Sequence, residues 1–182
     1  MRAVIISMPK AGTYLAANLL QCLGMNFSHI HIDPGMHRIF HDNNLKKFDK
    51  FSGNVGEAVS KLKENQFAVG HIPFNVENQR HLNDFKKVLI IRDKKDIAES
   101  AKRYRQEKGP DVSSIINDAN LNAIKKWSDN GAFVIDFKDI ITGNLEKIDR
   151  LQNYLFGSVT KNSNKAIIDA KNMDSLTKSS VR

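Results

Sequence analysis

Short apolar runs rich in β-branched residues alternate with segments of helical periodicity along most of the chain, and this alternation restricts the fold more than any other feature. The runs are almost continuously apolar, which is typical of strands buried on both faces of a parallel sheet. The predicted strands are residues 2–7, 66–70, 87–92 and 132–137. The predicted helices are residues 14–23, 55–65, 75–85, 94–108, 112–127 and 145–157. We therefore expect an α/β fold, a three-layer doubly wound parallel sheet with helices on both faces.

The length and composition suit a single domain. The chain has 182 residues, 41% of them hydrophobic, and no linker-like run interrupts it, so we expect one domain over residues 1–182. Residues 25–53 carry mixed signals and predict a short strand followed by irregular structure. The apolar run at residues 3–6 is too short for a signal-peptide core or a membrane span, so we expect a cytoplasmic protein without a membrane partner. Cys22 is predicted to be a buried, inert thiol on the apolar side of a helix.

The charge balance favours an anionic partner. The chain has 28 Lys+Arg against 20 Asp+Glu, a formal net charge of +8. A nucleotide, a sulfated glycan and a nucleic acid all carry suitable charge. The sequence contains no recognised nucleic-acid fold or aromatic stacking motif, so we expect no nucleic-acid partner. A basic protein that binds a polyanion without catalysis is kept as an alternative.

A loop with the sequence PKAGT, at residues 9–13, directly follows the first predicted strand. A loop that enters a helix presents backbone N–H groups and the positive end of the helix dipole, so it can hold a phosphate or a sulfate. Gly12 permits close approach, and Lys10 and Thr13 add donors. An ordinary turn with a surface lysine would have a similar sequence. The phosphate-binding loop of kinases has its lysine after the second glycine, whereas Lys10 precedes Gly12, so a P-loop kinase of a nucleotide or small molecule is the less favoured alternative.

Two further side chains lie where predicted strands end, His71 in the segment GHIP and Arg92 at the start of a charged turn. Ligands of parallel α/β sheets bind beyond the carboxyl ends of the strands, so both side chains are expected on the same edge as the PKAGT loop. Imidazole can take a proton from a hydroxyl group, and guanidinium offers a planar pair of donors to a phosphate. A structural histidine and a surface arginine that makes local ion pairs are the alternatives.

Together these segments resemble the sulfotransferase family that uses 3′-phosphoadenosine 5′-phosphosulfate (PAPS). Residues 9–14, PKAGTY, are similar to its donor loop, Pro-Lys-Ser/Ala-Gly-Thr-Thr, except that Tyr14 replaces the second Thr, so only its backbone N–H is carried over. Residues 88–100, VLIIRDKKDIAES, resemble its 3′-phosphate segment, and GHIP resembles its His-x-Pro segment. Residues 175–182 resemble a late segment that folds back on the 3′-phosphate, without the family's glycine. The resemblance implies a small, single-domain P-loop-like sulfotransferase fold.

The resemblance also implies a reaction, the transfer of the sulfuryl group of PAPS, as co-substrate, to an acceptor hydroxyl by in-line displacement. The implied catalytic residues are Lys10, which stabilises the leaving group, and His71, the general base. The residues implied in donor binding are Lys10, Ala11, Gly12, Thr13, Tyr14, Leu15, Arg92, Ser100, Lys178 and Arg182. No metal is expected, because lysine and backbone dipoles can meet the charge that develops.

The acceptor is the least determined part of the reaction. Loops at residues 25–65 and 74–84 are polar, which favours a carbohydrate or another polar small molecule that carries a hydroxyl group. The histidines of the first loop are interpreted as loop residues near the acceptor rather than as a metal cluster; they are His29, His31, His37 and His41. One of these histidines, or Glu57, is the substitute base if His71 is misplaced. The oligomeric state is not predicted.

Overall fold

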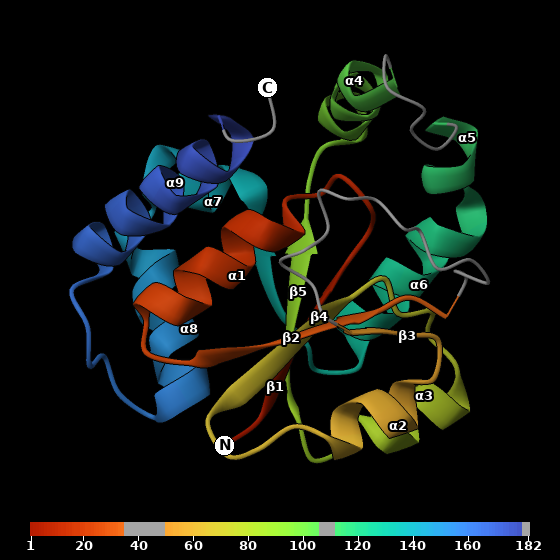
Figure 1. Ribbon diagram of the computed structural model, residues 1–182, viewed down its shortest axis with the longest axis horizontal. Helices are drawn as coiled ribbons and strands as arrows, with labels where there is room; N and C mark the ends of the chain where they lie inside the picture. The colour runs from red at the N-terminus through yellow and green to blue at the C-terminus, as the bar shows by residue number, and fades with distance from the viewer. Residues whose placement is uncertain (35–49, 106–111, 180–182) are drawn as a thin grey trace.

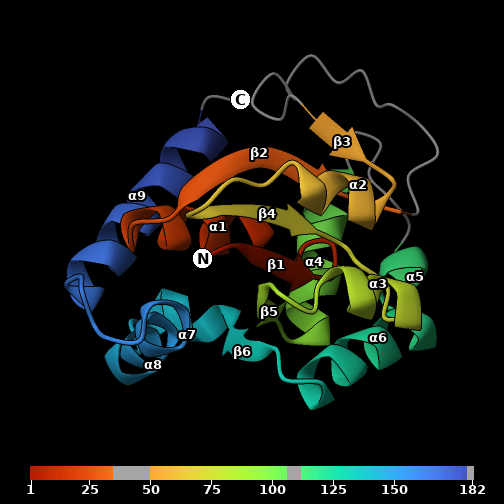
Figure 2. The same cartoon turned by 90° about the horizontal axis from the view of Figure 1, so that it is seen from below.

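The computed structural model describes residues 1–34, 50–105 and 112–179, and the side chains of residues 50–52, 104–105 and 175–179 are not described. Within these ranges, six strands form one sheet in the order β3-β2-β4-β1-β5-β6, and every neighbouring pair is parallel. Figure 2 shows the succession from β2 through β4, β1 and β5 to β6. The strands are β1 (Ala3–Ser7), β2 (Asn26–Ile32), β3 (Lys50–Ser52), β4 (Gln66–Gly70), β5 (Lys86–Ile91) and β6 (Phe133–Asp136).

Helices cover both faces of this sheet, as predicted. Helices α1, α7, α8 and α9 lie on the left of the sheet in Figure 1, and α2, α3 and α6 lie on its right. The helices are α1 (Thr13–Cys22), α2 (Val55–Ser60), α3 (Val76–His81), α4 (Lys94–Arg105), α5 (Val112–Ile115), α6 (Asp118–Asp129), α7 (Phe137–Thr142), α8 (Leu145–Phe156) and α9 (Ser163–Ser179). None of the described helices is long and apolar enough to cross a bilayer. The cytoplasmic location stays a prediction.

Strand β1 shows why the central strands read as continuous apolar runs. All five of its residues are buried. Ala3 and Ile5 face the core under α1, α8 and α9, whereas Val4 and Ile6 face the core under α2, α3 and α6. Successive side chains of a strand point to opposite faces, so a strand covered on both faces has no solvent side to mark with polar residues.

The strands end at one level, and this alignment positions the candidate site. Ile6 is in register with Gly70, and Gly70 is in register with Ile32. On the other side of β1, Ser7 is in register with Ile90, and Ile91 with Asp136. The segments that follow β1, β2, β4, β5 and β6 therefore begin along the same edge of the sheet. A separate apolar cluster packs α4 and α5 against the segment after β1; it comprises Met8, Ala11, Ile97, Ala101 and Ile115.

Two sequence interpretations of secondary structure are wrong. The helix predicted over residues 112–127 is two helices, because the side chain of Asn117 accepts a hydrogen bond from the Asn120 N–H and starts α6 as an N-cap. The short strand expected within residues 25–53 is β2, Asn26–Ile32, and it contains His29 and His31, so the interpretation of these two histidines as loop residues is wrong. Helices α7 and α9 were not predicted.

Cys22 is half-buried rather than fully buried, between α1 and α9. Its thiol lies 3.8 Å from the sulfur of Met173. Burial, with a smaller contribution from the charge of Asp169, raises the pKa of the Cys22 thiol. The thiol is therefore protonated at neutral pH and a weak nucleophile, as predicted, although it is more accessible than the sequence indicated.

Candidate active site

The PKAGT loop between β1 and α1 has a backbone that requires its glycine. Gly12 has φ 101° and is the N-cap residue of α1, without a side-chain cap. A Cβ atom at Gly12 would lie 2.4 Å from Cδ2 of Phe137, so both the conformation and the space exclude a side chain. Lys10 is also left-handed, with φ 66°, and the Ala11 N–H donates to the Met8 carbonyl at 3.2 Å. The tight turn presents the N-terminus of a ten-residue helix to the edge of the sheet.

Lys10 is half-buried at this edge. Burial lowers the pKa of Lys10 to about 8. A buried ammonium group has lost part of its hydration, so it interacts more strongly with an anion than a lysine on the open surface does. The role of Lys10 as a leaving-group stabiliser stays a prediction.

Thr13 differs from the expectation that its side chain adds a donor to the anion site. It is buried, and its hydroxyl lies 2.6 Å from the hydroxyl of Ser7 inside the fold. The adjacent Leu15 is also buried in the core. The backbone N–H groups of both residues belong to the first turn of α1, so they can contribute to an anion site whether or not the side chains do.

His71 follows β4 directly and bonds to Ser7, the last residue of β1 before the PKAGT loop. The Nδ1 atom of His71 lies 2.9 Å from the Ser7 carbonyl oxygen. A carbonyl oxygen only accepts, so Nδ1 carries the proton and Nε2 keeps its lone pair. Burial lowers the pKa of His71, opposed by the Ser7 hydrogen bond and the charge of Asp33, and Lys10 adds a smaller lowering effect. His71 is therefore a neutral imidazole with Nε2 able to take a proton.

The segment after His71 is anchored by α6, which covers the face of the sheet opposite to α1. Trp127 of α6 is fully buried, and its indole N–H donates to the Ile72 carbonyl at 2.9 Å. Its ring packs edge-on against Phe74, with centroids 4.8 Å apart. These contacts fix the backbone on the carboxyl side of His71.

His31, Asp33 and Tyr14 complete the surroundings of His71. His31 is buried on β2, and its ring meets the His71 ring edge-on with centroids 5.0 Å apart. The Tyr14 hydroxyl lies 3.0 Å from Nδ1 of His31, so its side chain also reaches the site, whereas the sequence indicated only its backbone. Burial, then the charge of His71, lowers the pKa of His31 to about 3. One nitrogen or oxygen atom from each of His31, Asp33 and His71 lies within 4.8 Å of the other two.

This cluster was not predicted, although the sequence contains a signal for it. Residues 29–32 alternate polar and apolar side chains, His-Ile-His-Ile, which is the period of a half-buried strand. Interpreting them as a strand would have placed Asp33 at a strand end, on the same edge of the sheet as His71.

Arg92 lies at the end of β5 and is held against the PKAGT loop. Its Nη1 atom donates to the Lys10 carbonyl at 3.1 Å, and its guanidinium carbon lies 4.1 Å from the centre of the Phe137 ring. Its Nε is buried and 4.0 Å from Oδ2 of Asp96, too far for a hydrogen bond. Ser100 lies half-buried on α4, the helix that begins just after Arg92. The structure thus brings Arg92 and Lys10 together.

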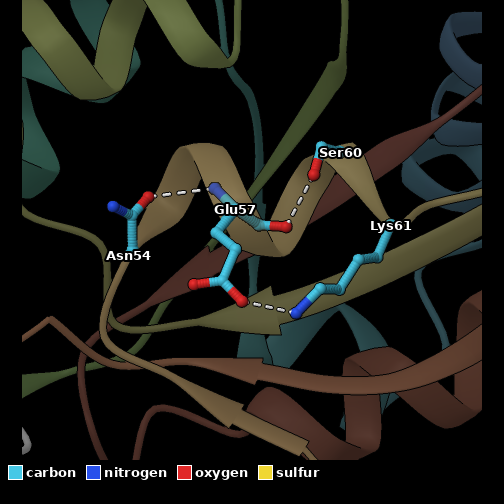
Figure 3. A network of polar contacts seen from close by, with 4 residues as sticks. All are labelled: Asn54, Glu57, Ser60 and Lys61. Carbon is cyan, nitrogen blue, oxygen red and sulfur yellow. Dashed lines mark hydrogen bonds and ion pairs between the residues drawn. The ribbon is translucent and has the colours of Figure 1, made fainter.

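Glu57, the substitute base, is in a poor position for that role. Figure 3 shows its carboxylate paired with Lys61, the C-cap residue of α2, and its backbone N–H bonded to Asn54. Oε1 of Glu57 and Nζ of Lys61 are 2.6 Å apart. The hydrogen bond from Lys61, and then its charge, lowers the pKa of this exposed carboxyl. Glu57 is consequently a weaker base than an ordinary glutamate.

The remaining predicted residues are only partly described. His29 is exposed on β2, with its ring 5.0 Å from that of Phe27. Lys178 lies in the last turns of α9, and its side chain is not described. His37, His41 and Arg182 lie outside the described residues.

Comparison with known proteins gives a result for structure alone. No protein-family model matches the chain, and no curated protein matches its sequence. The structure of mouse sulfotransferase SULT7A1, solved with PAP (adenosine 3′,5′-bisphosphate), superposes on this chain with a TM-score of 0.60 at 13% identity. The match covers 93% of this chain and 62% of the sulfotransferase chain. Retinol dehydratase, solved with androsterone and the inactive cofactor PAP, gives 0.59 at 13% identity, over 94% of this chain and 63% of its own.

The chain has the sulfotransferase fold. The predicted α/β class and the P-loop-like sulfotransferase fold are therefore confirmed. The chain spans less than two thirds of the length of each of these two proteins. In this sulfotransferase fold, the three groups singled out from the sequence share one edge, because Arg92 bonds to Lys10 in the PKAGT loop and His71 bonds to Ser7, the last residue of the strand that leads into this loop.

Proposed function

We propose that this protein is a PAPS-dependent sulfotransferase that moves the sulfuryl group of PAPS to an acceptor hydroxyl. The observation that carries the proposal is that Arg92 bonds to Lys10 in the PKAGT loop, while His71 bonds to Ser7, the last residue of the strand that leads into this loop. An anion-binding loop alone would suit many phosphate ligands. A second cationic group beside it suits a donor with two separate anionic groups. The two similar structures support this choice, because both hold PAP, adenosine 3′,5′-bisphosphate.

In the proposed complex, the 5′-phosphosulfate lies over the N-terminus of α1. The backbone N–H groups of residues 11–15 and the Lys10 ammonium group hold it, while Arg92 and Ser100 hold the 3′-phosphate. Lys178 and Arg182 are proposed as further ligands of the 3′-phosphate. The whole chain is proposed to act as one domain.

The proposed reaction is a single in-line displacement at sulfur. The acceptor oxygen forms a bond to sulfur as the bond between sulfur and the phosphate oxygen breaks, and PAP leaves. Nε2 of His71 takes the acceptor's proton, since Nδ1 is held as a donor by Ser7. Lys10 stabilises the negative charge that develops on the phosphate oxygen. None of these steps requires a metal ion.

The proposed acceptor is a polar hydroxyl compound, a carbohydrate or another small molecule. The support is the chemistry around His71, where His31, Asp33 and Tyr14 offer hydrogen-bonding groups. Polar side chains that surround a reacting hydroxyl favour an acceptor with additional hydroxyl groups, because such an acceptor can form hydrogen bonds with them. No nucleic-acid or membrane partner is part of the proposal.

The test is PAP formation from PAPS in the presence of a panel of sugars, polyols and phenols. We expect PAP to accumulate with at least one polar acceptor, and PAP to bind the protein more tightly than ATP does. No turnover with any acceptor together with no PAP binding would reject the proposal. Preference for ATP, with Mg²⁺-dependent turnover, would indicate a kinase instead.

Variants separate the proposed roles. Lys10→Ala should reduce turnover more than PAP affinity, and His71→Ala should abolish turnover while leaving PAP affinity nearly unchanged. Glu57→Gln is the matched control, because it removes an exposed carboxylate that pairs with the nearby Lys61, and it should leave both quantities unchanged. Loss of PAP binding in His71→Ala would assign His71 a structural role.

A further inference from the structure

Three side chains with metal-ligand chemistry converge beside the donor loop. They are His31 on β2, Asp33 just after β2, and His71 just after β4. One coordinating atom from each lies within 4.8 Å of the other two. Two imidazoles and one carboxylate form a donor set that suits borderline divalent metals such as Zn²⁺, Co²⁺ and Fe²⁺ better than Mg²⁺ or Ca²⁺, which prefer oxygen ligands.

The backbone holds these residues close together. The His71 N–H donates to the Ile32 carbonyl at 2.9 Å. A Cβ atom at Gly70 would lie 2.5 Å from the same carbonyl oxygen, so β2 and β4 approach more closely here than a side chain would allow. The convergence therefore depends on two paired strands of the sheet, which is a rigid support for a site.

Both imidazoles are oriented through their Nδ1 atoms. Nδ1 of His71 donates to the Ser7 carbonyl at 2.9 Å, and Nδ1 of His31 lies 3.0 Å from the Tyr14 hydroxyl. Histidines that bind metals commonly use their second ring nitrogen in such a hydrogen bond, which sets the ring orientation and makes the other nitrogen the ligand. In both residues Nε2 is then the coordinating nitrogen.

We infer that His31, Asp33 and His71 form a binding site for one Zn²⁺-like divalent metal ion, with the remaining coordination position open to water. Ligand atoms bind zinc at about 2.0–2.2 Å. Atoms up to 4.8 Å apart would need to close by on the order of 1 Å, which is within the reach of side-chain rotation.

Metal binding would compete with the proposed reaction. Nε2 of His71 has one lone pair, which either coordinates the metal or takes the acceptor's proton. Zn²⁺ is therefore expected to inhibit sulfuryl transfer, and this consequence rests on the proposed function. The binding itself does not, because it needs neither PAPS nor an acceptor.

The test is titration of tag-free, chelator-stripped protein with Zn²⁺ by calorimetry and with Co²⁺ by visible absorption. We expect one saturable site per chain and no comparable binding of Mg²⁺. His31→Ala and Asp33→Asn should each weaken Zn²⁺ binding at least about tenfold, as losses at metal sites commonly do. His29→Ala is the matched control, because His29 is exposed on the same strand, and it should leave Zn²⁺ affinity unchanged.

The result that would overturn the inference is absence of saturable binding, or affinity that is the same in the parent, His31→Ala and Asp33→Asn. Circular dichroism and PAP affinity of each variant show whether it is folded, so a misfolded variant would be replaced by His31→Gln or Asp33→Ala. PAP binding without Zn²⁺ binding would reject only the metal site. Zn²⁺ binding without PAP binding would reject only the proposed function.

Discussion

Replacing Arg92 by alanine tests the contact that joins the two halves of the proposed donor site. In the structure this side chain donates to the Lys10 carbonyl and covers the Phe137 ring. In the proposed complex it also binds the 3′-phosphate. Arg92→Ala is therefore expected to reduce both the stability of the free protein and its affinity for PAP.

The two contacts within the protein set the size of the stability effect. A hydrogen bond from a charged donor contributes about 1.5–3 kcal/mol, and a guanidinium over an aromatic ring about 0.5–2 kcal/mol. Arg92 keeps some exposure to solvent, so we take about 2 kcal/mol in total. For a chain of 182 residues this lowers Tm by about 4–8 °C. The lost phosphate contact is worth about 2 kcal/mol more, which raises the Kd for PAP about 30-fold.

Thermal unfolding followed by circular dichroism and calorimetric titration with PAP measure the two effects separately. Lys102→Ala is the control, because it removes an exposed positive charge from the same helix, α4, and should change neither quantity appreciably. An unchanged Tm in Arg92→Ala would refute the stabilising contact with the loop. A lowered Tm with unchanged PAP affinity would refute the role in phosphate binding.

Four other outcomes are expected. Gly12→Ala places a Cβ atom 2.4 Å from Phe137 on a residue whose φ is 101°. It should lower the free energy of unfolding by at least about 2 kcal/mol and weaken PAP binding. Unchanged thermal stability would contradict the strain expected at residue 12. Trp127→Phe removes the hydrogen bond to the Ile72 carbonyl and should cost about 1–3 kcal/mol in denaturant unfolding and reduce kcat more than PAP affinity. Gln152→Ala removes a buried side chain that makes three hydrogen bonds to the loop between α8 and α9 and one to Ser163 at the start of α9. It should cost about 2–4 kcal/mol while PAP affinity, measured below Tm, stays unchanged. Chelation of divalent metals should leave turnover equal or higher, and a loss of turnover that added metal restores would show that the reaction needs a metal.

The PKAGT loop and the ends of the apolar runs could be predicted because their information is local. A β-branched run followed by glycine and a helical period indicates a strand, a turn and a helix, whatever lies around them. Capping residues limit this reasoning. Asn117 divides one helical pattern into two helices, and Asp136 with Asp139 forms a capping box that starts α7 inside a segment that reads as continuous with β6.

The sequence by itself determined the α/β class, the strand–loop–helix unit with Lys10 and Gly12, and the placement of His71 and Arg92 at strand ends. Only the tertiary structure decided which of these groups meet. The bond from Arg92 to Lys10 joins residues 82 positions apart, and the approach of His71 to His31 and Asp33 depends on the pairing of Gly70 with Ile32. The physical reason is that strand order and register are properties of the whole sheet, set by how both apolar faces of each strand are buried, and no local pattern encodes them.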